Sequence, residues 1–475
     1  MLPNGNRRPP RTAAGSGWIL GRFGGEEDGA LFIFALYTFV LILMMAGIGI
    51  DLMRFERDRS LLQSTLDRAV LAATDLNQIR PPRAVVIDYF DKAGLLDYLD
   101  EDSIEVTQGI NFREVSARAD ATIATMFMRL SGVDTLSATA AATALERIPN
   151  VEISLVLDIS SSMNQNGRIG ALRPAAAAFI DTVLRGEAKE KTSINLIVYG
   201  GQTNPGPWMF AHLNGQRYPD IPLSRRNGGD ANGRFPNVSS CLELTANDFP
   251  HPDLPKAHSY QQTPHFMYWN LDPKTTDWGW CPSDEKAIIY ASNDAAKLNH
   301  LVNTMRLHGG TGTQHAIKWA VSLLNPSTQG TFAAMAGDGM IPSEFAARPA
   351  AWDDTETAKY IVLMTDGQIN PQYRPKDPMD PKNPTVALLS RQNDARQTVS
   401  SSVAFSQFLA QCNLAKASPR NITVYTIAFD SPLSVQNEMI QCASSPSHFF
   451  NARTDDITSV FASIARQINQ LKLVN

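Results

Sequence analysis

The chain has 475 residues, 43% of them hydrophobic and 19% charged, and its formal net charge is -5 at pH 7. This length and apolar content allow two or three domains, each with a buried core. The charge is mild, and Lys and Arg form neither a long run nor a pattern interleaved with aromatics, which argues against nucleic acid as a partner.

The amino-terminal part predicts a membrane anchor. Residues 1–28 are rich in Gly, Pro and Arg, and we expect a disordered cytoplasmic tail. Residues 29–51 follow as GALFIFALYTFVLILMMAGIGID, in which Asp51 is the first charge. At about 1.5 Å per residue this run can cross a ~30 Å hydrocarbon core. It continues without an A-x-A-like exit, so an uncleaved transmembrane helix is favoured over a cleaved signal peptide.

The orientation of this helix is less strongly encoded. Arginines flank the span on both sides, so the positive-inside rule hardly decides between the two orientations. The size of the remaining chain and its cysteines favour a cytoplasmic amino end and an exported bulk.

The four cysteines indicate disulfides. They lack the close paired spacing of a zinc site, and an even number in an exported chain fits disulfide bonds. Sequential pairs are the simplest arrangement, but the sequence leaves the pairing open, and unpaired buried thiols of a cytosolic protein remain the alternative. The cysteines are Cys241, Cys281, Cys412 and Cys442.

Residues 52–150 predict a helical extension and then a small β-rich unit. Residues 52–75 keep a helical period in which Leu62, Leu66, Ala69 and Ala73 share a face, which we expect to pack on the following domain. After the Pro81-Pro82 break come three roughly alternating segments, IEVTQGI, VSARADATIAT and LSATAAATALE, separated by turn residues.

Residues 151–163, VEISLVLDISSSM, predict a buried strand that ends in Asp158, Ser160 and Ser162. This D-x-S-x-S spacing can turn three hard oxygen ligands toward one point at the end of the strand. One carboxylate with two hydroxyls suits Mg²⁺, which takes oxygen ligands and keeps waters. We therefore expect residues 151–475 to form a domain around a metal site.

The rest of the chain predicts a doubly wound, mostly parallel α/β sheet. A helix over 167–185 and a strand at SINLIVYG form a parallel unit. Residues 200–290 then break the pattern and predict a large insertion with local packing, which a disulfide between its two cysteines can hold. Its three histidines make a zinc site conceivable, but surface loop histidines are the preferred interpretation; they are His251, His258 and His265.

Two further segments can complete the site. In HGGTGTQHAIKWAVSLL, glycines precede Thr311, and either Thr311 or Thr313 can deliver a hydroxyl. In KYIVLMTDGQIN an apolar strand ends at Asp366. Strands at NITVYTIAF and HFFNA and a closing amphipathic helix follow. Because loops of an open α/β sheet converge at its carboxyl edge, we expect these side chains to meet there.

This constellation resembles the von Willebrand factor A fold and its metal-ion-dependent adhesion site. The likeness runs from about residue 151 to 473, with 200–290 outside it. It implies an Mg²⁺ site, with Mn²⁺ or Ca²⁺ possible, in which a protein partner's acidic residue completes the coordination. The matching metal ligands are Asp158, Ser160, Ser162, Thr311 and Asp366.

The two ends of the chain resemble TadG-like proteins of the tight-adherence (Flp) pilus system. The apolar span, its Asp51 exit, SLLQSTLDRAVLAATDL and MFMRLSGVDTLSATAAATA look like the TadE/TadG-like membrane module, and CASSPSHFFNARTDDITSVFASIARQINQLKL is very like the family's carboxyl end. Phe32, Ile33 and Phe34 stand where TadE-type members carry a Glu, which favours the TadG-like branch. The resemblance implies a single-pass protein of the bacterial inner membrane with a periplasmic bulk, acting in pilus adhesion or assembly.

Two other functions remain as alternatives. A surface adhesin for host or matrix ligands would share the fold and differ only in its partner. A metal-assisted hydrolase is disfavoured, because the sequence shows no base beside the D-x-S-x-S motif, no G-x-S-x-G elbow and no Walker loop. We therefore expect a binding protein and no enzyme.

Overall fold

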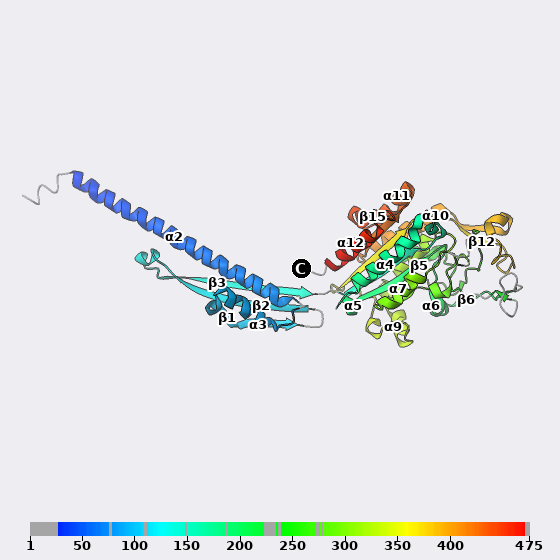
Figure 1. Ribbon diagram of the computed structural model, residues 1–475, viewed down its shortest axis with the longest axis horizontal. Coiled ribbons are helices and arrows are strands. Elements are labelled where there is room, and N and C mark those ends of the chain that lie inside the picture. The colour runs from blue at the N-terminus through cyan, green and yellow to red at the C-terminus, as the bar shows by residue number, and fades with distance from the viewer. Residues whose placement is uncertain are drawn as a thin grey trace, which may run out of the picture. The chain divides into compact units, whose positions relative to one another are not determined.

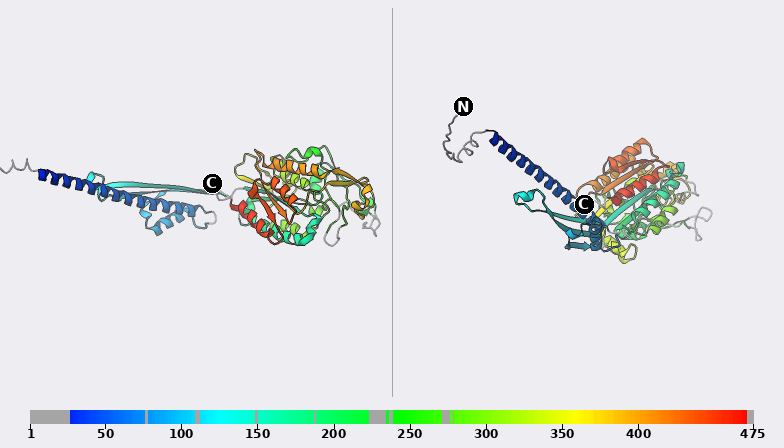
Figure 2. Two further views of the ribbon diagram at one scale, coloured as in Figure 1. Left: turned by 90° about the horizontal axis from the view of Figure 1, so that it is seen from above. Right: turned by 60° about the vertical axis from the view of Figure 1, so that its left-hand side comes forward.

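A computed structural model describes residues 27–75, 78–108, 112–147, 150–186, 188–222, 234–235, 239–270, 276–277 and 279–470 (Figures 1 and 2). The chain forms two compact units that divide between residues 147 and 148. The tail expected at residues 1–28 lies outside the described residues, except for its last two, which begin the first helix.

Unit one begins with a single long helix, α2 (Glu27–Thr74), drawn in blue in Figure 1. Within the described part of the chain, one helix is long and apolar enough to cross a membrane, and it spans Leu31–Thr74. Between residues 31 and 50 most side chains are exposed around the whole circumference of this helix. A helix that is apolar on every side is typical of a membrane span.

The second half of α2 packs on a three-stranded antiparallel sheet of β1 (Leu99–Gln108), β2 (Phe112–Ala124) and β3 (Thr135–Arg147), in that order. The predicted apolar face of the helix is buried in the resulting core, with Leu66, Ala69 and Ala73 fully covered. The three strands coincide with the three alternating segments that the sequence indicated, except that the last two residues of the first segment, 109 and 110, lie outside the described residues and the second segment runs one residue past β2.

The sequence did not predict helix α3 (Pro82–Ala93) in this unit. The Pro81-Pro82 pair, interpreted as a break, instead starts the helix, because Pro at the first helical position has no amide to leave unpaired. Gly94 ends the helix in the left-handed conformation with φ 68°. Val86 and Phe90, one turn apart, are fully buried.

Unit two is built on a six-stranded sheet with the order β10-β5-β4-β11-β14-β15, in which only the β10–β5 pair is antiparallel. Counted along the chain, the five parallel strands lie in the order 2-1-3-4-5, so the topological switch point falls between β4 and β11. The strands are β4 (Asn150–Asp158), β5 (Thr192–Tyr199), β10 (Ile289–Ser292), β11 (Thr357–Thr365), β14 (Thr423–Phe429) and β15 (Phe449–Ala452).

Helices cover both faces of this sheet, which confirms the predicted doubly wound α/β class (Figures 1 and 2). Apolar side chains of α4 (Arg168–Val183), α7 (Ala295–Thr304) and α12 (Ile457–Gln470) pack on one face. Those of α8 (Thr313–Ser322), α10 (Ser401–Lys416) and α11 (Leu433–Cys442) pack on the other. Burial on both faces explains why the central strands are continuously apolar.

The predicted insertion contains α6 (Gly206–His212) and short strands, and the Cys241–Cys281 disulfide lies within it. The second disulfide, Cys412–Cys442, joins α10 to α11, so the simplest pairing is confirmed. Strand β10 belongs to the main sheet from residue 289, next to the expected end of the insertion at about residue 290. The remaining elements are α5 (Ala188–Lys191), β6 (Gly215–Gln216), β7 (Ile221–Pro222), β8 (Arg234–Phe235), β9 (Tyr260–Gln261), α9 (Gln329–Gly337), β12 (Gln372–Pro375) and β13 (Ala395–Val399).

One histidine of the insertion differs from its predicted surface position. His251 and His258 are exposed, but His265 is buried. Burial, followed by the nearby His308, lowers the pKa of His265 to about 4. Among the described residues, no group of three or more His, Cys, Asp or Glu side chains is arranged to hold a metal ion, so the zinc alternative gains no support.

Candidate metal centre

The two strands at the switch point deliver the two predicted carboxylates. Strand β4 ends at Asp158, and β11 ends at Thr365, directly before Asp366. These strands are parallel neighbours, with Leu157 opposite Met364. Since ligands of open α/β sheets bind beyond the carboxyl ends of the strands at such a switch point, both acids lie where the fold favours a binding site.

The carboxylate of Asp158 holds the first and third loops together. Its Oδ1 accepts a hydrogen bond from the Ser160 amide at 2.7 Å, and its Oδ2 accepts one from the Thr365 hydroxyl at 2.6 Å. The side chain is fully buried. Asp158 therefore orients the serine loop and ties it to the end of β11.

Hydroxyl and carboxylate oxygens of two loops converge above Asp158. The hydroxyls of Ser160 and Ser162 lie 2.9 Å apart. Ser162 Oγ donates to Asp366 Oδ1 at 2.8 Å, and Ser160 Oγ lies 3.4 Å from the same oxygen. Three oxygen atoms that the sequence assigned to one metal ion thus lie in mutual contact.

The second loop reaches this cluster through its glycines. The Gly312 amide donates to the Gly200 carbonyl at 2.8 Å, and the Asn370 amide donates to the Thr311 carbonyl at 2.9 Å. A Cβ atom at Gly312 would overlap the carbonyl oxygen of Gly201, so only glycine allows this close approach to the end of β5. These contacts fix Thr311 between the end of β5 and the loop that follows β11.

A small space bounded by hydroxyls lies over Gly367. A Cβ atom added there would lie 3.5 Å from Ser162 Oγ and 3.5 Å from Thr311 Oγ1. Thr311 thus presents its hydroxyl near that of Ser162. The hydroxyl of Thr313 lies 3.4 Å from the Tyr199 hydroxyl, which itself lies 3.4 Å from Asp158 Oδ2. The five predicted residues, from three loops, are all brought together.

Arg168 is the main site residue that the sequence interpretation missed. Its Nη1 donates to Asp366 Oδ2 at 2.8 Å, and its Nη2 donates to the Asp430 carbonyl at 2.7 Å. Its side chain is 11% exposed and that of Asp366 is fully buried. A signal was present: Arg168 is the first residue of α4, where the helix dipole disfavours a cation unless an anion pairs with it.

Two more residues support Asp158 and were also missed. The Thr365 hydroxyl bonds to it, and the Tyr199 hydroxyl lies 3.4 Å from its Oδ2. Burial, and then the charge of Asp158, raise the pKa of Tyr199 well above its ordinary value, so the phenol stays protonated and remains a donor. Both residues end strands that flank β4, and the sequence interpretation gave neither of them a role, although Thr365 directly precedes the predicted ligand Asp366.

The two buried acids disfavour each other's charge. Burial, followed by the charge of Asp366, raises the pKa of Asp158 to about 7. Burial also raises the pKa of Asp366, although hydrogen bonds from Ser162 and Arg168 oppose that shift. A divalent cation would favour the ionised forms of both acids. Two buried carboxylates with three hydroxyls form a hard oxygen donor set, and this set fits Mg²⁺.

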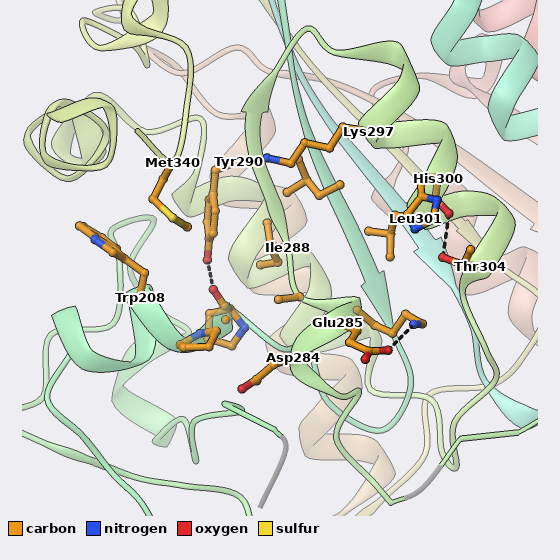
Figure 3. Close-up of a pocket in the computed structure, with 16 residues that line it drawn as sticks. Trp208, Asp284, Glu285, Ile288, Tyr290, Lys297, His300, Leu301, Thr304 and Met340 are labelled. Atoms are coloured by element: carbon orange, nitrogen blue, oxygen red, sulfur yellow. Dashed lines mark hydrogen bonds and ion pairs between the residues drawn. The ribbon is translucent and has the colours of Figure 1, made fainter. Parts of the chain in front are cut away.

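A separate pocket of about 640 Å³ lies along the edge strand β10, between α6 and α7. Figure 3 shows Trp208, Tyr290 and Met340 around it, with Lys297 and His300 on α7. None of the five predicted metal ligands lines this pocket. The candidate metal centre is therefore a polar cluster at the carboxyl edge of the sheet, distinct from this pocket.

Comparisons with known proteins give one family and several similar structures. Residues 29–75 match the Tad family of TadE/G-like Flp pilus-assembly proteins. No curated protein matches the chain. The von Willebrand factor domain of the type V pili tip protein Mfa5 from Porphyromonas gingivalis is 14% identical with a TM-score of 0.36, and the match covers 69% of this chain and 98% of that one.

Two further solved structures are similar at lower coverage of their own length. The pilus adhesin SpaC from Lactobacillus rhamnosus GG is 12% identical with a TM-score of 0.34, over 77% of this chain and 34% of that one. A von Willebrand factor type A protein from Catenulispora acidiphila is 11% identical with a TM-score of 0.28, over 77% and 49%. This chain thus spans about a third and about half of their lengths.

The family match falls on the helix that has the properties of a membrane span. One such helix and the matched module fit a single-pass membrane protein. The chain therefore carries a TadE/G-like Flp pilus-assembly module at its amino-terminal helix, ahead of a doubly wound α/β unit.

Proposed function

We propose that this chain acts in assembly of a Flp pilus by binding a protein partner through a divalent cation at the switch point of its sheet. The observation that carries the proposal is the convergence of Ser160, Ser162 and Asp366 oxygens, within hydrogen-bonding distance, beside Thr311. These oxygens come from separate loops whose backbone geometry brings them to one point.

The residues of the cluster would share the work of holding the ion. Ser160, Ser162 and Thr311 offer neutral hydroxyls, while Asp158 and Asp366 supply the charge. Both oxygens of Asp158 already accept hydrogen bonds, so its part is to orient Ser160 and to compensate the cation. Bound here, Mg²⁺, or Mn²⁺ or Ca²⁺ in its place, would keep net positive charge for a carboxylate of the partner.

The location that we propose is the bacterial inner membrane, with unit two in the periplasm. The matched module and the membrane helix support the anchor. The two disulfides support an oxidising compartment for unit two, because such bonds are rare in the cytosol. The side of the membrane is thus inferred from redox chemistry, since the flanking arginines do not decide it.

We also propose that unit two is a binding module with no enzymatic activity. The polar groups gathered at the switch point are hydroxyls and carboxylates that bond to one another and to Arg168. His308 lies next to the second loop, but its Nδ1 is 3.4 Å from the Gly279 carbonyl in the insertion. We therefore assign His308 no catalytic role. A metal-dependent turnover assay in which Asp366→Asn removed hydrolysis would overturn this assignment.

Site-specific crosslinking in native membranes tests the binding proposal. A photoreactive amino acid would replace Asn164, which is exposed in the serine loop. We expect an adduct with one protein that forms in Mg²⁺, disappears in EDTA and disappears in the Asp366→Asn variant. The same probe at exposed Ala334 on α9 serves as the control and should give no Mg²⁺-dependent adduct.

Adducts at residue 164 that persist in EDTA and in Asp366→Asn would show that the partner binds without the ion, and would contradict the proposal. Mass spectrometry of the adduct identifies the partner and the carboxylate closest to the probe.

A further inference from the structure

The connection between β2 and β3 presents an apolar tip to solvent. It contains the 3-10 turn Met128–Ser131, which Gly132 ends in the left-handed conformation. Met126 is 65% exposed and Leu130 is 76% exposed, and the aromatic ring of Phe127 is also partly exposed. Such a cluster on a short turn is unusual in a water-facing loop, where polar and turn-forming residues dominate.

The tip is fastened to α2 through a single carboxylate. Asp51 accepts hydrogen bonds from the backbone amides of Met126 at 3.0 Å, Phe127 at 2.7 Å and Met128 at 2.8 Å. Its side chain is almost fully covered by these contacts. The tip therefore holds a defined position along the helix, and that position is the residue at which the apolar span meets its first charge.

A second contact lies one helical turn deeper. A Cβ atom at Gly47 would lie 2.6 Å from Phe127 Cβ, so Phe127 packs directly on the helix backbone there. Four residues correspond to about 6 Å along the helix axis. Phe127 thus reaches about 6 Å below Asp51, into the level of the uncharged segment that spans residues 29–50.

We propose that the β2–β3 tip is a second membrane contact of this chain, inserted into the interface of the bilayer that α2 crosses. Met126, Phe127 and Leu130 would lie among the outer acyl chains, and the Arg129 guanidinium would bind lipid phosphates. Arg129 pairs with Asp134 at 3.2 Å, but both side chains are about three-quarters exposed, so that pair leaves the guanidinium accessible. An apolar body with a cationic end is the composition that membrane interfaces favour.

Lipid is the occupant that the position of the tip favours. The exposed side chains of the tip continue the exposed apolar surface of α2 at the same level, without a charged residue of the helix between Gly47 and Asp51. A membrane that covers residues 31–50 must therefore meet the tip as well. The inference rests on the membrane helix alone and is independent of the metal centre.

The consequence is a two-point attachment. A single helix leaves a membrane-proximal unit free to tilt, whereas a helix and a tip that enter the bilayer together restrict that tilt. The β1–β3 sheet, which carries the tip at one end, would then be held at a fixed height and angle above the lipid surface.

Fluorescence quenching in lipid nanodiscs tests the proposal on the full chain. All four native cysteines lie in disulfides, so Leu130→Cys provides a single thiol for the dye NBD. In nanodiscs of anionic phospholipids with brominated acyl chains, we expect blue-shifted emission from residue 130 that is quenched relative to unbrominated lipid. Ile79→Cys, an exposed apolar position after the end of α2, is the control and should remain unquenched.

Two glycine variants sharpen the test. Gly47→Ala forces the tip away from the helix and should reduce the quenching at residue 130. Gly49→Ala, in the same span but with nothing within 4 Å of the added methyl, should leave it unchanged. Water-like, unquenched emission from residue 130 in the purified chain would overturn the proposal and leave a protein partner as the occupant of the tip.

Discussion

Two regions of this molecule are organised around buried aspartates, and they use them differently. Asp51 in unit one accepts three backbone amide hydrogen bonds from the β2–β3 tip. Asp158 and Asp366 in unit two accept bonds mainly from side-chain hydroxyls and from Arg168. In the first region backbone amides occupy the carboxylate oxygens. In the second region the two carboxyl groups lie mainly beside hydroxyl oxygens that can bind a metal ion, and each is affected by the charge of the other.

The difference separates a structural carboxylate from a binding one. Backbone amides cannot leave without unfolding the turn, so Asp51 has no capacity to exchange its partners for a ligand. Hydroxyls can rotate and exchange a protein hydrogen bond for a cation, and two neighbouring acids gain when a cation arrives.

Replacing Arg168 should give the largest loss of stability. Arg168→Met leaves Asp366 as a buried acid without its cation, and losing one partner of a buried pair typically costs about 3 kcal/mol of stability. Mg²⁺ should restore part of this loss, because it supplies positive charge to the same acid. Denaturant unfolding followed by tryptophan fluorescence measures both the loss of stability and its recovery in Mg²⁺, since six of the seven tryptophans belong to unit two.

Arg173→Met is the matched control on the same helix, because the Arg173 guanidinium donates to a backbone carbonyl, that of Met305, and not to a carboxylate. It should lose less stability and show no rescue by Mg²⁺. A loss in Arg168→Met that is equal in EDTA and in Mg²⁺ would show that Arg168 and the ion do not share Asp366.

Replacing Asp51 should act on unit one alone. Asp51→Ala leaves the amides of Met126, Phe127 and Met128 without their acceptor, so their hydrogen exchange should accelerate by about tenfold or more. Exchange in the strands of unit two should not change. Equal protection of the three amides in the variant would mean that the tip holds its position without the carboxylate.

Mg²⁺ affinity should depend on pH through Asp158, whose pKa is raised from 3.8 to about 7. Because the ion needs the ionised acid, its affinity should fall by about tenfold for each pH unit below 7. In EDTA the stability of the fold has the opposite pH dependence. The folded state holds a proton on Asp158 that the unfolded chain has released, so the free energy of unfolding falls as the pH rises from about 4 to about 7. Mg²⁺ titrations at about pH 6 and about pH 8 check the affinity, and denaturant unfolding in EDTA at about pH 5 and about pH 7 checks the stability; Asp158→Asn should abolish both trends.

The smallest expected change in stability comes from Gly367→Ala. The added methyl would lie at ordinary contact distance, 3.5 Å, from the Ser162 and Thr311 hydroxyls, so the fold should change by no more than about 0.5 kcal/mol. Mg²⁺ affinity should nevertheless fall by about tenfold, since the methyl fills the space that the hydroxyls surround. Gly330→Ala on α9, where a methyl meets nothing within 4 Å, is the control. An unchanged affinity in Gly367→Ala would place the ion elsewhere.

The sequence was sufficient for the central strands and for the meeting of the polar side chains at their ends, because these signals are local; metal binding by those side chains stays a prediction. Strand β4 is an unbroken apolar run that ends at Asp158, and β11 ends in the same way before Asp366. The apolar face of α2 was likewise visible as a helical period, and Leu66 and Ala69 are buried as expected.

The features that the sequence did not reveal depend on long-range contacts or short elements. Arg168 meets Asp366 from 198 positions away, and no local pattern encodes that pair. Strand β10 has four residues and gains its partner only when the sheet forms. His265 is covered by the packing of the insertion around Trp280, which a loop-like composition does not predict.

Calorimetric titration of Mg²⁺ into the full chain in lipid nanodiscs tests the central claim most directly. We predict saturable binding of one ion by the wild-type chain. We also predict loss of that heat in Asp366→Asn, and its retention in Asp353→Asn, which removes the same charge at an exposed turn. Equal heats for all three proteins, or no heat for the wild type, would contradict the assignment of the switch-point cluster as a metal centre.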